Sequence, residues 1–145
     1  MTPAYEVTTD RHRFDVDLIH TFLCSSYWAA NMPREVLERV IRHALCFGVF
    51  AGQTQVAFAR VITDYATFAY LSDLFVVPEH RGRSVSKLLM RSILEHPDLQ
   101  GLRRFLLATK DAHGLYAQFG FKPLANPDDF MTIHHPDVYK KESRA

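Results

Sequence analysis

The sequence has few cysteines, no long apolar run and almost no excess of charge of either sign. Cys24 and Cys46 are its two cysteines, and each lies inside an apolar segment. A disulfide between them is one alternative, but two buried free thiols in a reducing compartment are favoured. The longest apolar stretches, such as residues 74–77, are far too short to span a bilayer. We therefore expect a cytoplasmic protein that has no membrane partner.

The charge balance and the scarcity of metal ligands exclude two further classes of function. Seventeen Lys and Arg against sixteen Asp and Glu leave a formal net charge of +1. Nucleic-acid binding normally requires a basic face, so no nucleic-acid partner is expected. His12, His134 and His135 lack partners at ligand spacing, and two lone cysteines do not form a zinc site. No metal is expected.

The hydrophobic pattern of the first half indicates two helices followed by a β-meander. With 145 residues, 48% of them hydrophobic, and no repeat or linker, residues 1–145 are expected to form one domain. Apolar residues at helical spacing give way to β-branched and aromatic runs after residue 45. Helices are expected over residues 15–26 and 33–45, and strands over residues 5–8, 46–51, 55–62 and 68–77.

The pattern of the second half indicates a crossover to one more strand, followed by two short strands that close the sheet. Pro78 ends the long strand, Asp111 is expected to cap a helix that ends near Phe119, and Gly120 then occupies its C′ position. A further helix is expected over residues 84–94, and strands over residues 104–108, 121–124 and 130–133. The fold class is a mixed α/β sheet, antiparallel in its N-terminal half, with one strand–loop–helix–strand crossover.

The segment from residue 74 to residue 90 has the features of an anion site. An apolar strand enters a basic turn, which becomes the first turn of an amphipathic helix. The first N–H groups of a helix have no intrahelical partner and lie at the positive end of its dipole. Gly82 would let the backbone approach an anion, and Arg81 and Arg83 add cationic donors. The alternative is an ordinary solvated basic turn.

This turn resembles the coenzyme A loop of the GNAT acetyltransferase superfamily. The family pattern is Arg or Gln, two residues, Gly, one residue, then Gly or Ala, and Arg81 matches its first position. Ser84 and Ser86 stand where the two small residues usually lie. At Ser84 a Cβ must fit where glycine normally lets a phosphate approach, and its hydroxyl is expected to cap the helix or to bond the phosphate.

A second segment, residues 109–123, resembles the other GNAT signature, a helix with Leu-Tyr followed by Gly-Phe. Thr109 stands where the family often has an Asn that contacts pantetheine. The two motifs and the order of elements extend the resemblance over residues 5–133. It implies a GNAT-like fold and acetyl-CoA as co-substrate. The cofactor-binding residues that it implies are Phe75, Val76, Val77, Arg81, Gly82, Arg83, Ser84, Val85, Ser86, Thr109, Ala112 and Tyr116.

Two residues are candidates for catalysis. The phenol of Tyr116 can donate a proton to the departing thiolate, the alternative being that it only packs beside its neighbours. Asp73 is the best candidate for the base, although a water relay or an ion pair between Asp73 and Arg60 is the alternative. On a regular strand, Leu71, Asp73, Phe75 and Val77 share one face, and a carboxylate there would need a task or a partner.

The acceptor is expected to be a small-molecule primary amine. Tyr27 and Trp28, in the loop between the first two helices, could wall its site, or Trp28 could cover the core. Direct transfer is expected, since both cysteines are remote from the motifs. The alternatives are a protein lysine or N-terminus as acceptor, and a non-catalytic acyl-CoA-binding module. The oligomeric state stays open, with a homodimer among the alternatives.

Overall fold

The computed structural model describes residues 4–140, and at their centre lies a five-stranded sheet. The strands follow chain order across the sheet, and four of them form an antiparallel meander. The last strand pairs in parallel with its neighbour, as a crossover requires. The mixed sheet expected from the sequence is therefore confirmed. The strands are β1 (Tyr5–Thr8), β2 (Leu45–Ala51), β3 (Thr54–Thr63), β4 (Phe68–Val76) and β5 (Arg104–Leu107).

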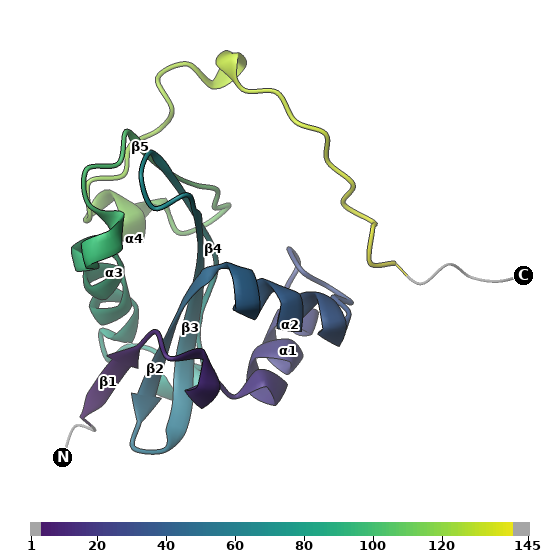
Figure 1. The fold of residues 1–145 in the computed structure, drawn as a ribbon, viewed down its shortest axis with the longest axis vertical. Coiled ribbons are helices and arrows are strands. Elements are labelled where there is room, and N and C mark those ends of the chain that lie inside the picture. Colours follow the sequence, from purple (N-terminus) through teal and green to yellow (C-terminus); the bar gives the residue numbers. More distant parts are fainter. Residues whose placement is uncertain (1–3, 141–145) are drawn as a thin grey trace, which may run out of the picture.

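Helices cover both faces of the sheet. Helices α1 (Val16–Ser25) and α2 (Arg34–His43) lie on one side of it, and α3 (Val85–Glu95) and α4 (His113–Ala117) lie on the other (Figure 1). The Asp15 carboxylate accepts a hydrogen bond from the Leu18 N–H and caps α1. Pro33 directly precedes α2, where the missing N–H costs no intrahelical bond.

Each face of the sheet has its own hydrophobic core. The core beneath α3 includes Phe47, Leu89 and Ile93, whereas the core beneath α1 and α2 includes Leu23 and Phe58. These side chains are almost completely buried, and each contributes about 1.5–3 kcal/mol to folding. The two cores hold the sheet between them, so that the carboxyl end of β4 has a rigid support on both faces.

A β-bulge interrupts β4 at Asp73. Arg60 of β3 pairs with Ser72 and Phe58 pairs with Phe75, so one residue of β3 faces two of β4. Asp73 has a φ of 57°, in the left-handed region that L-residues rarely adopt. The expectation that Leu71, Phe75 and their neighbours share one face is wrong. Because the extra residue shifts the alternation, Leu71 packs in the core beneath α3, and Phe75 packs in the core beneath α1 and α2.

The start of α4 differs from the sequence expectation. Asp111 does not cap it: the helix begins after Ala112, whose N–H donates to the Thr109 hydroxyl over 3.1 Å. Thr109, and not Asp111, therefore stabilises the turn into α4 with its side chain, as Ser and Thr often do. The helix is also shorter than expected and ends at Ala117, and Gly120 has the expected positive φ, 92°.

The expected closing strands at residues 121–124 and 130–133 do not form. Within residues 4–140, β5 is the last strand, and residues 125–140 extend away from the sheet (Figure 1). Pro123 lies within the first segment and Pro127 lies between the two, and a proline lacks the N–H group that a strand ladder requires. The apolar composition of residues 130–133 suits a strand, but residues 4–140 supply no neighbouring strand for it.

Candidate active site

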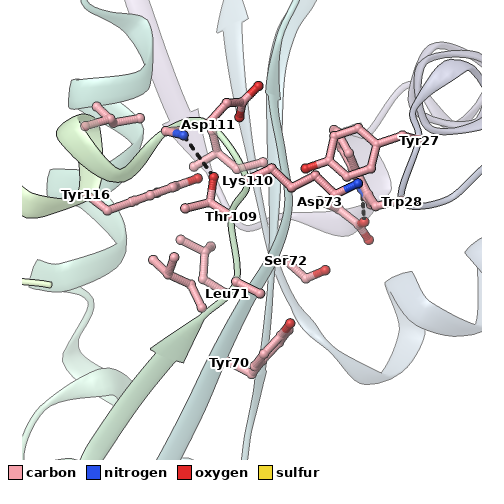
Figure 2. Close-up of a pocket in the computed structure, with 15 residues that line it drawn as sticks. Tyr27, Trp28, Tyr70, Leu71, Ser72, Asp73, Thr109, Lys110, Asp111 and Tyr116 are labelled. Carbon is pink, nitrogen blue, oxygen red and sulfur yellow. Dashed lines mark hydrogen bonds between the residues drawn. The ribbon is translucent and has the colours of Figure 1, made fainter. Parts of the chain in front are cut away.

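A cavity lies where β4 and β5 separate. Their pairing runs from Phe68 with Arg104 to Leu71 with Leu107, where β5 ends while β4 continues to Val76. The last residues of β4 therefore have no strand beside them on that edge. The cavity at this point has a volume of about 450 Å³. Its walls come from β4, from the end of β5 and the residues 108–112 that follow it, from α4, and from the loop between α1 and α2 (Figure 2).

Tyr116 forms one wall of the cavity. Its side chain projects from α4 toward Thr109 (Figure 2). The Tyr116 ring stands edge-on to Phe121, with 6.0 Å between the ring centres. Partial burial raises the pKa of the Tyr116 phenol, and the charges of Asp111 and Tyr27 raise it further. The phenol is therefore held in its neutral, proton-donating form. The hydroxyl is part of the cavity wall, which is the position that a general acid requires.

Asp73 forms the floor opposite Tyr116 and is held by two partners. Arg60 Nε donates to one carboxylate oxygen over 2.7 Å, and Trp28 Nε1 donates to the other over 2.8 Å. The Asp73 side chain is 2% exposed, so this is a buried ion pair. Of the roles that the sequence left open, the ion pair with Arg60 is present. The role of Asp73 as a base stays a prediction.

Tyr27 and Trp28 form the wall contributed by the loop between α1 and α2. Both line the cavity, and their rings stand edge-on at 5.1 Å. Trp28 is 43% exposed and is tied to Asp73 through its indole N–H, so it belongs to the cavity wall and not to a closed core. Across the cavity, Lys110 Nζ lies 4.4 Å from the centre of the Tyr27 ring (Figure 2).

Sequence reasoning missed nine lining residues, of which four have polar side chains. Tyr70 and Ser72 precede the bulge on β4, and Lys110 and Asp111 lie between two expected site residues. The last two could have been found, because Thr109 and Ala112 on either side were already assigned to the site. Tyr70 and Ser72 could not, since a regular alternation places them away from Asp73.

The basic turn lies at the carboxyl end of β4, just beyond the cavity. Gly82 has a φ of 76° with open space around its Cα, and Ser84 has a φ of 62°. Ser84 directly precedes α3, yet its hydroxyl makes no capping hydrogen bond, so the expected cap is wrong. Arg81 Nε donates to the Val76 carbonyl over 3.0 Å and ties the turn to the strand. Arg83 is exposed.

The remaining expected site residues differ in whether their side chains or only their backbone groups can reach a ligand. Phe75 and Val85 are buried, so they can reach a ligand only through backbone groups. Thr109, Ala112 and Tyr116 line the cavity itself. Val76 is the last residue of β4, Val77 follows it before the basic turn, and Ser86 lies in the first turn of α3.

Metal-binding groups and membrane-spanning helices are both absent from the described residues. Residues 4–140 contain no group of three or more His, Cys, Asp or Glu side chains that could hold a metal ion. Within the same residues, every helix is too short or too polar to cross a membrane.

Comparison with known proteins identifies the family of this site. The sequence profile of the Acetyltransferase (GNAT) family matches residues 15–121. A protein of Gibberella zeae that is named as an acetyltransferase is 33% identical, over 79% of this chain and 76% of its own. A Xanthomonas campestris structure assigned to the GNAT family is 54% identical, with a TM-score of 0.94, over 97% of this chain and 100% of that one.

A more distant structure has the same fold. A Clostridium acetobutylicum protein classed as an acetyltransferase, solved with acetyl-CoA, superposes with a TM-score of 0.66 at 12% identity, over 92% of this chain and 96% of that one. The matched region of the family profile contains both the basic turn and the segment with Tyr116. The chain therefore belongs to the GNAT family of acetyltransferases.

Proposed function

We propose that this protein transfers an acetyl group from acetyl-CoA directly to a primary amine of a small molecule. The observation that carries the proposal is the cavity in which the Tyr116 phenol faces the open edge of β4. A thioester lying along that edge would place its leaving sulfur on the side of α4. Family membership supports acetyl transfer, and the proposal adds the donor, the acceptor class and the roles of individual residues.

The residues present fit acetyl-CoA. The unpaired backbone groups of residues 72–76 can bond the amide groups of the pantetheine arm as a neighbouring strand would. The open space at Gly82 and the start of α3 after Ser84 suit a pyrophosphate. Arg81 and Arg83 supply positive charge beside it. Acetyl-CoA would bring the activated acyl group as a thioester.

Tyr116 is the proposed general acid. As the amine nitrogen forms its bond to the acyl carbon, the C–S bond breaks and the thiolate leaves with the electron pair. The neutral phenol donates its proton to that sulfur and then regains one from solvent. Deletion of one such donor typically lowers the chemical step by about 100- to 10,000-fold.

Asp73 is the proposed base and acts through a water molecule. An alkylamine with a pKa of about 10.4 is protonated at neutral pH and must lose a proton before it attacks. The carboxylate oxygens of Asp73 accept bonds from Arg60 and Trp28, but each oxygen has a second lone pair. A water bonded there can take the amine proton while it passes one of its own protons to the Asp73 carboxylate, which then releases that proton to solvent.

The walls of the cavity favour a small acceptor. Its volume of about 450 Å³ lies within the range of small-molecule sites. The contact of Lys110 with Tyr27 narrows it on the side away from β4. A protein lysine or N-terminus would have to part these side chains, so a small amine is the better fit. Tyr27, Trp28 and Tyr70 supply aromatic walls for it.

The test is a screen of amines for release of CoA from acetyl-CoA. The panel should contain amino acids, polyamines, amine-bearing xenobiotics and a lysine peptide, with product mass measured for each. We expect turnover with a small amine and little with the peptide. Turnover only with the peptide would contradict the acceptor class. Binding of acetyl-CoA with no turnover on a broad panel would support the non-catalytic module.

Two variants test the residue roles with the best acceptor. Tyr116→Phe should lose about 100- to 10,000-fold in turnover with acetyl-CoA affinity nearly unchanged. Asp73→Asn should also lower turnover, most at lower pH, where the amine is most protonated. Full activity of Tyr116→Phe, under conditions where chemistry limits the rate, would remove the phenol from the mechanism while leaving the family assignment intact.

A further inference from the structure

Among the described residues that line the cavity, Lys110 carries the only positive charge. It lies between β5 and α4, and its side chain crosses the cavity toward the loop between α1 and α2 (Figure 2). None of the ion pairs within residues 4–140 includes its ammonium group. An ammonium group at a ligand site that has no carboxylate partner in the protein is available to an anionic group of the ligand.

The Tyr27 ring holds this ammonium group over the cavity. Lys110 Nζ lies 4.4 Å from the ring centre, and a cation within about 6 Å of a ring centre is attracted to the aromatic face. A lysine side chain has a flexible four-carbon stem, so without this contact its charge would have no fixed position. The ring face is not an oxygen acceptor, so the N–H donors of the ammonium stay available to a ligand.

The two carboxylates of the cavity do not neutralise Lys110. Asp73 has its own cation, because it forms an ion pair with Arg60. Asp111 follows Lys110 in the chain, but it lies close enough to Tyr116 for its charge to raise the pKa of that phenol. The cavity therefore has negative charge near the phenol and a positive charge without a carboxylate partner across from it (Figure 2).

Lys110 belongs to the acceptor side of the cavity and not to the basic turn. Residues 78–86 supply none of the described residues that line the cavity. A donor lying along β4 would have its phosphates at that turn, beside Arg81 and Arg83. The wall that holds Lys110 is instead the loop with Tyr27 and Trp28. The charge of Lys110 is therefore directed at the molecule that receives the acetyl group.

We propose that the acceptor amine carries a carboxylate, as amino acids do, and that Lys110 binds this carboxylate. The inference rests on the proposed function, because it names the acceptor class within it. The amine would lie between the Tyr116 phenol and Asp73, and the carboxylate would point toward Tyr27. Lys110 is thus a specificity-determining residue, and it takes no part in the transfer of protons.

The charges of the cavity match those of a zwitterion. The negative charge of Asp111 near the phenol favours the ammonium end of an amino acid, and Lys110 favours the carboxylate end. A polyamine carries positive charge at each end and would meet Lys110 as a like charge, which disfavours that class. The remaining walls include Leu74, Leu115 and Tyr70, so an amino acid with an apolar side chain suits them.

The test compares amino acids with their decarboxylated counterparts in the wild type and in Lys110→Met. Leucine is paired with isopentylamine, and phenylalanine with phenethylamine. Methionine is also unbranched, so it keeps an apolar stem beside Tyr27 and removes the charge. The wild type should prefer the amino acid in kcat/KM, and the variant should reduce this preference by about 10-fold or more, as expected for one lost charge-assisted bond. The two amines of a pair differ in pKa, but this difference is the same for both enzymes and cancels.

The effect should separate in KM and kcat. The KM for the amino acid should rise and kcat should change little, because the carboxylate is bound equally before and during the transfer. Lys110→Arg keeps the charge and should retain a preference for the amino acid. Lys122→Met is the matched control, since Lys122 is exposed and does not line the cavity, and its preference should equal that of the wild type. Salt should reduce the preference of the wild type more than that of Lys110→Met.

A binding measurement separates this inference from the proposed function. Trp28 is the single tryptophan of the chain and lines the cavity, so its fluorescence reports binding there without turnover. With CoA present, leucine should change this fluorescence at a lower concentration than isopentylamine does. Lys110→Met should remove most of that difference.

The outcomes distinguish the two proposals. Preferential binding of leucine without turnover of any amine would leave this inference standing and contradict the proposed function. Turnover of amines with no preference for a carboxylate would overturn this inference alone. A preference that survives Lys110→Met would also overturn it, as would a variant whose main loss is affinity for acetyl-CoA. Neither binding nor turnover of any pair member would overturn both.

Discussion

At the scale of single residues, the Tyr116 phenol is the group whose protonation the site controls. Burial is the largest cause that raises its pKa above the ordinary value of 10.0. A phenol is neutral when protonated, so a low-dielectric surrounding and nearby negative charge both disfavour its ionised form. The proton that it donates is therefore present below the raised pKa and is lost only as the pH rises through that value.

The raised pKa of the Tyr116 phenol gives a spectroscopic prediction. The tyrosinate absorbance of the wild type, minus that of Tyr116→Phe, isolates the titration of Tyr116. Its midpoint should lie above that of a free tyrosine amide, which titrates near pH 10. A midpoint at or below that of the free amide would mean that the ring is more solvated than its position in the cavity indicates.

Asp73 illustrates what sequence reasoning could and could not supply at this scale. A carboxylate in an apolar strand indicated either a task or a partner, and Arg60 was named as the partner correctly. The bond from Trp28 could not be predicted, because it joins residues 45 positions apart. The left-handed backbone of Asp73 was also unpredictable, since Asp carries no signal for positive φ as strong as that of glycine.

At the scale of elements, the junction of β4, the basic turn and α3 depends on the backbone of Ser84. Its φ of 62° and ψ of 23° lie in the left-handed region, where a residue with a Cβ is strained by about 1–2 kcal/mol. Glycine adopts this conformation freely, which explains why the family pattern has a small residue at this position. The hydroxyl does not offset the strain, because it makes no capping bond.

Ser84→Gly should therefore raise the free energy of unfolding, by up to about 1 kcal/mol after the entropy that glycine adds to the unfolded chain. Affinity for acetyl-CoA should stay equal or improve. Ser86→Gly is the matched control: Ser86 lies inside α3, so the same change there should destabilise by about 0.5–1 kcal/mol. Urea unfolding measures both. Equal losses of stability in the two variants would show that the strain at Ser84 is negligible.

Most elements were predictable from local signals, and residues 130–133 show one reason why others were not. The apolar periodicity and the caps placed α1, α2, α3 and strands β1 to β5 within a few residues. Residues 130–133 were expected to be a strand for the same reason, but a strand also requires a neighbour. The local sequence pattern indicates that a segment can form a strand, but it does not show whether another strand lies beside it.

At the scale of the whole molecule, two cores on either side of one sheet make it a cooperative unit. Cys46 of β2 lies in the core beneath α1 and α2 and is 3% exposed. Burial raises the pKa of its thiol to about 12, so the reactive thiolate is rare in the native protein. Cys24 of α1 is only partly buried.

Alkylation should therefore distinguish the two thiols. Cys24 should be modified in the native protein, whereas Cys46 should react at least about 1,000-fold more slowly than in urea, since exposing it requires global unfolding, which costs about 5 kcal/mol or more. Cys46→Ala identifies the native signal as that of Cys24. Similar native rates for both thiols would indicate local opening of β2 and would contradict a cooperative core.

The bulge at Asp73 also sets a rule for insertions and deletions. Leu71 precedes it and Phe75 follows it, and the two side chains enter opposite cores because the bulge absorbs one of the residues between them. Removal of any single residue from 72 to 74 would leave an odd spacing between Leu71 and Phe75, so regular alternation alone would keep the two side chains in opposite cores, and the bulge would disappear. The two cores therefore tolerate the loss of this one residue, and what such a homologue would give up is the left-handed position that carries the Asp73 carboxylate.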